Sequence, residues 1–590
     1  MKEILLNKIV HHQFLLKKNN KTLRIIFFLR LIAGMSFILS LYFWIRFHEP
    51  IWGFMFSAFV VGFLYILLKN SHYLEQNKYY KRIIQINENE LHALNWEFSK
   101  FENGHEFIDP HHPYSADLDI FGNRSIFQSL NRTVIQGARN RLANLLIAPF
   151  KVKEEVVNQQ NNIKDLSSKL EFRQNFAAYG MAVEESPSDI LSLSFWIKEK
   201  SIFLHTKAIR ILRYVMPVLS ILSFVLYLAD SKFLSIFLLF SGAIWFITAM
   251  NAKRINHIHL QLTKKGKMIG SRSKLFELIH LEKFQSPQLL SIQTKCEEAA
   301  KNFKELGKIV EAFDTRLNAL IYLVLNTFLA FDLIVIIRLE KWKERNKDKL
   351  VDWFQILDEF DSLNSLANFA WANPEYVFPE ISANEMFFEA QEISHPLMPK
   401  QQRVANSIIF DTTKFVILTG ANMSGKSTFL RTIGINMIFA FMGMPVSAKS
   451  LKLSMLKLMT SMKVADSLVE NTSYFLAELK RLQSIMAELQ KEEKVFILLD
   501  EILKGTNSAD KLEGSIKLVR KFLSLHCLGI IATHDIELAK LENEYPDPVC
   551  NMSFESDISK SELIFDYKIR LGPAKTKNAA LLMQRMGIVD

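Results

Sequence analysis

The sequence predicts a multidomain protein with transmembrane helical hairpins, an all-α domain and a C-terminal α/β domain that carries a phosphate-binding loop. Three observations lead to this prediction. Long apolar runs occur in two pairs, charged stretches between and after them place apolar residues at helical spacing, and short apolar runs typical of buried strands follow residue 375. With 590 residues, the chain is long enough for several separate cores.

The composition agrees with such a division. Hydrophobic residues make up 49% of a chain that is also 23% charged, so the apolar residues are concentrated in local segments. The formal net charge of +11 suits nucleic acid, but much of the excess lies beside apolar runs, where anionic lipid headgroups explain it equally well. Cys296, Cys527 and Cys550 form no CxxC pair, so neither a disulfide framework nor a zinc site is predicted, and a reducing cytosol fits.

The first pair of apolar runs predicts an N-terminal membrane hairpin over residues 1–69. Its helices, 25–45 and 51–68, are each close to the ~20 residues that span hydrocarbon. A second hairpin is predicted over 209–252, with helices 211–229 and 233–250. Basic residues outside both hairpins place their ends in the cytoplasm. We therefore expect a multi-pass membrane protein with four transmembrane helices, and with its N-terminus and C-terminal domain cytoplasmic. The alternative is that these runs are buried helices of a soluble domain.

A fifth apolar run, Leu317–Ile337, contains Asn326 and Asp332. One more crossing would move the C-terminal domain to the other side of the membrane, away from cytosolic nucleotide. We therefore interpret this run as a helix of a soluble core rather than a fifth span.

The remaining segments divide into helical and α/β parts. Residues 70–208 and 253–374 have few glycines and helical spacing of apolar residues, which predicts one helical domain interrupted by the second hairpin. Residues 375–590 form the predicted α/β domain. Its runs Lys414–Thr419, Val495–Leu499 and Leu528–Thr533 are typical of buried parallel strands.

The strongest motif follows the first of these strands. It matches GxxxxGK[ST] between a strand and a helix, where glycines let backbone N–H groups and the helix N-terminus face phosphate oxygens. Lys426 is expected to reach the β and γ oxygens, and the Ser427 hydroxyl to complete an Mg²⁺ shell. The predicted loop and helix start are Gly420, Ala421, Asn422, Met423, Ser424, Gly425, Lys426, Ser427 and Thr428.

Three further residues stand at the ends of the next two strands. Asp500 and Glu501 follow VFILL, at the same edge of the sheet as the loop. We expect Asp500 to bind Mg²⁺ or its water and Glu501 to polarise the attacking water. His534 follows GIIAT and is expected to sense the γ-phosphate or orient that water. Together these residues predict a Mg²⁺-dependent P-loop ATPase.

With these motifs in order, the chain resembles the MutS family of DNA mismatch-repair ATPases. TGANMSGKST is similar to the family's phosphate loop, LLDEILKGTNSAD to its Walker B segment and ATHDIELA to its switch histidine. Stretches near residues 113–146 and 359–381 are similar to its core and lever helices, so the resemblance covers roughly 110–590. It implies phosphate contact by Asn422, adenine contact by Val404, and a homodimer in which Ser473 of DSLVENTSYFLAELKRL reaches the partner's γ-phosphate.

The departures from the family pattern affect function. No N-terminal mismatch-reading domain with a Phe-x-Glu motif is found, and the second hairpin stands where relatives carry a DNA-gripping clamp. The resemblance implies an ATP-driven conformational switch that binds DNA, without an evident mismatch-reading domain. The alternative is a membrane-tethered remodelling or transport-like machine that does not bind DNA.

Two further groups of residues are candidate sites. The histidines and aspartate His105, Asp109, His111 and His112 could bind a metal, but Pro110 and Pro113 favour a turn. The basic runs Lys264–Lys267 and Lys341–Lys349 would suit DNA phosphates, but solvated helix faces are the commoner outcome.

Overall fold

In the computed structural model the chain forms two compact units. The structure describes residues 1–183, 193, 195–263, 265–382, 386–462, 474–491, 493–503, 507–525, 527–559 and 562–575. Unit 1 comprises Met1–Asn95, Thr133–Arg139 and Lys169–Asp361; unit 2 comprises Trp96–Arg132, Asn140–Ser168 and Ser362–Asp590.

The two units do not coincide with the predicted segments 70–208, 253–374 and 375–590. Residues 96–132 and 140–168 group with the C-terminal part because specific bonds tie them there. The Asp117 carboxylate accepts from the Thr460 hydroxyl at 2.5 Å, and the Arg481 guanidinium donates to the His112 carbonyl at 2.7 Å. Such long-range bonds leave no periodic trace in the sequence.

Unit 1 is helical. Its helices are α1 (Lys2–Phe47), α2 (Pro50–Leu94), α6 (Leu170–Gly180), α8 (Ile202–His205), α9 (Lys207–Ala229), α10 (Leu234–Thr263), α11 (Gly266–Leu281), α12 (Pro287–Asp314), α13 (Ala319–Leu329) and α14 (Phe331–Asn346). The division between the units falls within α4 (Gln136–Ile147) and α15 (Leu350–Ala372).

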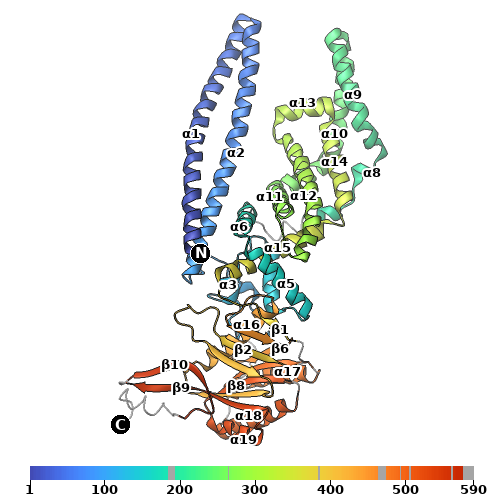
Figure 1. Cartoon of the computed structure of the whole chain (residues 1–590). Helices are drawn as coiled ribbons and strands as arrows, with labels where there is room; N and C mark the ends of the chain where they lie inside the picture. The colour runs from blue at the N-terminus through green and yellow to red at the C-terminus, as the bar shows by residue number, and fades with distance from the viewer. Residues whose placement is uncertain are drawn as a thin grey trace. The chain divides into compact units, whose positions relative to one another are not determined.

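Helices α1 and α2 form a long antiparallel hairpin (Figure 1). Pro50 begins α2 at a position where a missing N–H costs nothing, which makes the turn after α1 sharp. Aromatic pairs such as Phe43 and Trp52, with ring centroids 4.8 Å apart, join the apolar portions. Polar pairs take the place of aromatic pairs farther from the turn of the hairpin, where the Asn77 amide donates to the Asn20 side-chain oxygen at 2.7 Å.

By length and composition, four helical segments are able to cross a membrane among the residues that the structure describes. They are Lys2–Phe47, Pro50–Leu94, Lys207–Ala229 and Ser231–Thr263, and at most 17% of the most apolar window of each is buried within the protein. Their exposed apolar surfaces make the alternative of buried helices in a soluble core a poor description of this structure.

The interpretation of Leu317–Ile337 as one helix is wrong, although its part within α14 is buried as expected of a core helix, with Leu333, Ile336 and Ile337 among the buried residues. The run is broken into α13 and α14, whose axes differ by 84°. Ala330 at the break has φ 48° and ψ 46°, a left-handed conformation that ends α13. Asn326 is the buried residue of α13, whereas the helix's apolar side chains are largely exposed, which is the reverse of a core helix.

Unit 2 contains two sheets. A six-stranded sheet has the order β10-β9-β4-β8-β7-β6, in which all neighbours are parallel except β10, which is antiparallel to β9. A four-stranded sheet has the order β1-β5-β2-β3. The strands are β1 (Glu380–Ile381), β2 (Phe388–Ile393), β3 (Asn406–Phe410), β4 (Phe415–Gly420), β5 (Ser450–Leu453), β6 (Lys457–Ser461), β7 (Val495–Asp500), β8 (Cys527–Thr533), β9 (Val549–Ser559) and β10 (Glu562–Leu571).

Helices complete unit 2. They include α3 (Ile126–Leu130), α5 (Lys153–Ser167), α16 (Lys426–Phe441), α17 (Tyr474–Leu489), α18 (Ser508–Leu523) and α19 (Leu541–Glu544). The three runs predicted as buried parallel strands are β4, β7 and β8. Every residue of β4 and β8 is buried, so these central strands read as continuous apolar runs. The sheet therefore brings the ends of β4, β8 and β7 to one edge.

Candidate nucleotide-binding site

The loop after β4 is shaped by its glycines. Gly420 has φ 152° and Gly425 has φ 105°, both conformations that residues with a Cβ rarely adopt. A Cβ on Gly420 would lie 2.8 Å from the Phe554 carbonyl oxygen, so the loop and β9 could not approach as they do. Gly425 caps α16, which directs the helix N-terminus and its free N–H groups toward the loop.

Lys426, the lysine of the GxxxxGK[ST] motif, is held inside this loop. Its side chain is buried, and its ammonium group donates to the carbonyls of Gly420 at 2.8 Å and Ala421 at 2.9 Å. A buried ammonium group next to a helix N-terminus is an attractive partner for an anion. The structure thus places a positive charge where the sequence predicts phosphate.

The carboxylates arise at the end of β7. Glu501 has φ 48°, and its backbone N–H donates to the Ala532 carbonyl of β8 at 2.9 Å. That backbone conformation is costly for a residue with a side chain, and it turns the chain sharply at the sheet edge. Glu501 and Asp500 consequently both line the pocket that contains Ser427.

His534 follows β8 and contacts Glu501. Its Nδ1 atom lies 3.3 Å from the Glu501 carboxylate, while 53% of the imidazole side chain remains exposed. His534 therefore lies beside the carboxylates without lining the pocket itself.

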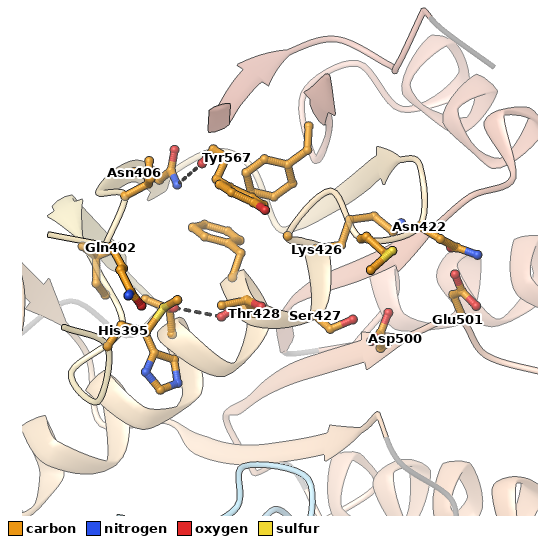
Figure 2. A pocket seen from close by; sticks show the side chains of 18 residues that line it. His395, Gln402, Asn406, Asn422, Lys426, Ser427, Thr428, Asp500, Glu501 and Tyr567 are labelled. Atoms are coloured by element: carbon orange, nitrogen blue, oxygen red, sulfur yellow. Dashed lines mark hydrogen bonds between the residues drawn. The ribbon is translucent and has the colours of Figure 1, made fainter. Parts of the chain in front are cut away.

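One cavity of about 640 Å³ unites these groups, a size suited to a nucleotide. Figure 2 shows Asp500 and Glu501 at one end of it, near Ser427 and Asn422, with His395, Gln402 and Asn406 at the other. Of the residues predicted from sequence, the pocket is lined by Val404, Asn422, Met423, Gly425, Lys426, Ser427, Thr428, Asp500 and Glu501. Gly420, Ala421 and Ser424 belong to the same loop, and Ser473 lies outside the described residues.

Apart from Val404, sequence reasoning missed the end of the pocket far from the carboxylates. Asn406 of β3 donates to the Tyr567 carbonyl at 3.0 Å and accepts from the Ile569 N–H at 2.8 Å, which ties β10 to β3. Tyr567 has φ 54° and lies against the loop, because a Cβ on Gly425 would meet its ring at 3.0 Å. No motif marks these residues, and they come from segments more than 150 positions apart in the sequence.

His395 gives this end of the pocket a neutral imidazole. Burial lowers the pKa of His395 to about 4, and the positive charges of Arg431 and Arg403 add to that effect. Its Nδ1 accepts from the Leu397 N–H at 3.2 Å, so the proton of the neutral ring is on Nε2. The ring can therefore donate one hydrogen bond, but it adds no charge at neutral pH.

The candidate metal cluster near residue 110 is a turn, as the prolines favoured. Asp109 accepts from the His111 N–H at 2.9 Å, and the His112 ring bonds the Ile147 carbonyl at 3.0 Å. Across the described part of the chain, no group of three or more His, Cys, Asp or Glu side chains is arranged to hold a metal ion.

Comparison with known proteins supports the relationship inferred from the motifs. Residues 416–587 match the family model for MutS domain V. Over 242 residues the chain is 33% identical to the DNA mismatch repair protein MutS of Clostridium botulinum. The aligned region covers 39% of this chain and 25% of that protein. It is 29% identical over 301 residues to MutS of Thermotoga neapolitana, covering 50% of this chain and 34% of that protein. The chain thus spans about a quarter to a third of the curated relatives it matches, and its C-terminal part is related to MutS.

Proposed function

We propose that this MutS-related chain binds ATP with Mg²⁺ in the pocket of unit 2 and hydrolyses it to drive a conformational switch. The single observation that carries the proposal is that the loop, Lys426, Ser427 and the two carboxylates line one cavity of nucleotide size. Lys426 and the N-terminus of α16 lie where the phosphates are proposed to bind. His395 and Tyr567 lie away from the carboxylates, where the adenine base is proposed to bind.

The residues divide the chemistry. Lys426 exchanges its two carbonyl partners for phosphate oxygens when nucleotide enters, and the loop N–H groups orient the triphosphate. Glu501 accepts a hydrogen bond from the water that attacks, and His534 holds the Glu501 carboxylate in position. Magnesium supplies charge neutralisation at the phosphates. The Ser427 hydroxyl and the Asp500 carboxylate fit it, because both are oxygen donors that line the same part of the pocket.

The larger assembly is also a proposal. Two chains form a homodimer in which Ser473 of each chain completes the partner's site. The dimer undergoes its ATP-driven conformational change while bound to DNA near a membrane. The helices Lys2–Phe47, Pro50–Leu94, Lys207–Ala229 and Ser231–Thr263 anchor it as four spans, with the ATPase domain and N-terminus cytoplasmic. As sequence segments, 1–69 and 209–252 are the proposed membrane hairpins, 70–208 and 253–374 the helical core and lever, and 375–590 the ATPase domain; the compact units cut across the helical segments. The named relatives are DNA mismatch repair proteins, which favours DNA over a remodelling role.

Replacing the ammonium group tests the nucleotide site. Lys426→Ala is expected to weaken ATP binding by about 1.5–3 kcal/mol, because a charged hydrogen-bond donor to phosphate is lost. Binding of a fluorescent ATP analogue to the full-length protein in detergent measures this. Lys449→Ala is the matched control, since Lys449 lies outside the pocket and its side chain is 67% exposed. Equal binding by wild type and Lys426→Ala contradicts the proposal.

A further inference from the structure

Helix α13 exposes an apolar surface that the four spans do not explain. Its sequence, ALIYLVLNTFL, contains no charged residue, and Leu320 is 78% exposed. The other exposed members of this surface are Leu317, Ile321, Leu323 and Val324. A contiguous apolar surface of this kind marks an interaction site, because leaving it in water is unfavourable.

The C-terminal half of α13 is bonded to the second hairpin. The Thr327 carbonyl accepts from the Ser220 hydroxyl at 2.9 Å, and the Trp245 indole donates to the Thr327 hydroxyl at 3.0 Å. The Asn326 amide lies 3.4 Å from the Thr248 hydroxyl. Polar side chains that bond to neighbouring helices, together with uncharged apolar side chains left exposed, are typical of helices packed in lipid and not of helices in a water-soluble core.

The contacts also fix the level of α13 along the hairpin. Figure 1 shows α13 lying across α9 and α10, and both helices contact it. The Phe328 ring is 4.9 Å from that of Phe224 and 5.7 Å from that of Phe237, centroid to centroid. Phe224 and Phe237 lie within the segments 211–229 and 233–250. If these segments are in hydrocarbon, the C-terminal end of α13 is at the same level.

The charged residues beside α13 are neutralised. The buried Asp332 carboxylate lies 3.1 Å from the Arg316 guanidinium and accepts from the Tyr322 hydroxyl at 2.7 Å. Pairing of this kind lets an ionic group remain at a membrane boundary without an unpaired charge.

The chain returns to the side from which it came. Helices α12 and α14, which flank α13, pack against each other, and the Trp342 indole of α14 donates to the Asn302 carbonyl of α12 at 2.8 Å. With its two flanks side by side and an 84° bend at Ala330, α13 does not make a fifth crossing.

We propose that α13 is a re-entrant membrane helix: it embeds Leu320, Leu323 and Val324 in lipid beside the α9–α10 hairpin. This inference rests on the proposal that α9 and α10 cross a membrane. It explains how a fifth apolar segment is buried in lipid while the number of crossings remains even.

Lipid contact can be measured residue by residue. Leu320→Cys is labelled with an environment-sensitive fluorophore in the full-length protein and reconstituted into phosphatidylcholine and phosphatidylglycerol vesicles. Quenching is then recorded with lipids that carry a nitroxide high on the acyl chain. Label on the native cysteines is subtracted with the unsubstituted chain; Cys296 and Cys527 are buried and Cys550 is partly buried. An unchanged helical circular dichroism spectrum and elution volume in detergent show that each variant is folded.

Two leucines of similar exposure serve as references. Leu228→Cys in α9, at a residue that is 68% exposed, reports the hairpin, and Leu281→Cys in α11, at 69%, reports a surface away from the proposed spans. We expect loss of fluorescence at 320 comparable to that at 228, and none at 281.

The outcomes separate the two proposals. Quenching at 228 with none at 320 overturns the re-entrant helix and leaves the hairpin in the membrane. Quenching at neither position overturns both. A blue-shifted but unquenched label at 320 identifies a protein contact in place of lipid, and it also overturns the inference.

Discussion

At the residue scale, the chemistry depends on a few side chains placed by unusual backbone. Glu501 is held at φ 48° by a bond to β8, and His534 lies 3.3 Å from its carboxylate. Local strain of this kind persists where surrounding structure fixes it, and it places the carboxylate at the sheet edge.

Glu501→Gln is expected to bind ATP normally and to hydrolyse it roughly 10²- to 10⁴-fold more slowly, because the amide cannot accept a proton from the attacking water. Single-turnover hydrolysis and ATP-analogue binding are measured in parallel. Glu513→Gln is a suitable control, since Glu513 lies on α18 and is ion-paired with Lys517 at the surface. Unchanged turnover in Glu501→Gln removes Glu501 from the role of base.

His395 predicts acid sensitivity of unit 2. Because its pKa falls from 6.5 to about 4 on folding, the folded state binds fewer protons than the unfolded state between these values. The contribution of His395 to the free energy of unfolding is therefore fully present above pH 6.5 and is lost as the pH falls toward 4. The total change in that free energy is about 3 kcal/mol. The difference in stability between wild type and His395→Gln, measured by denaturation from pH 4 to 7.5, is expected to shrink as the pH falls. A constant difference contradicts the neutral, buried imidazole.

The motif residues of this site could be predicted because they are contiguous in sequence and stand at strand ends. The residues at the far end could not. His395, Gln402 and Asn406 lie in one stretch that carries no motif, and Tyr567 is brought to Asn406 from 161 positions further along the chain.

At the scale of elements, the central strands tolerate little change. Gly529 of β8 faces Phe415 of β4, and a Cβ there would lie 2.4 Å from the Phe415 ring and 3.2 Å from the Ile497 carbonyl. The glycine is therefore required by close packing between neighbouring strands.

Gly529→Ala is expected to destabilise unit 2 by about 1–3 kcal/mol through overpacking. Gly270→Ala in α11 is the contrasting variant, because a Cβ there meets nothing within 4 Å and alanine favours a helix by up to about 1 kcal/mol. Calorimetry with and without ATP identifies the transition of unit 2. If both variants unfold at the wild-type temperature, the packing argument fails.

The element that sequence reasoning misjudged is the run Leu317–Ile337. Its hydropathy predicts one helix, but the left-handed Ala330 and the bonds of Asn326 and Asp332 divide it. A single bend residue without glycine or proline gives no reliable sequence signal.

At the scale of the whole molecule, the apolar spans and the strand pattern of the nucleotide domain could be read from the sequence, because both are local and periodic. The grouping of residues 96–132 and 140–168 with the C-terminal part could not, because it depends on contacts such as that of Asp117 with Thr460. Residues 416–587 match MutS domain V, and the chain spans about a quarter to a third of the curated MutS proteins it matches.

The most direct test of the account is binding of the detergent-solubilised full-length protein to homoduplex, mismatched and branched DNA. It is measured across a salt series with ATP, ADP or no nucleotide. Lys426→Ala, in which nucleotide binding is expected to be weakened, serves as the control. We predict salt-sensitive binding whose affinity changes with the bound nucleotide in the wild type and not in Lys426→Ala. Absence of DNA binding under every condition, with ATP hydrolysis intact, contradicts the account and favours a membrane-tethered machine that does not act on DNA.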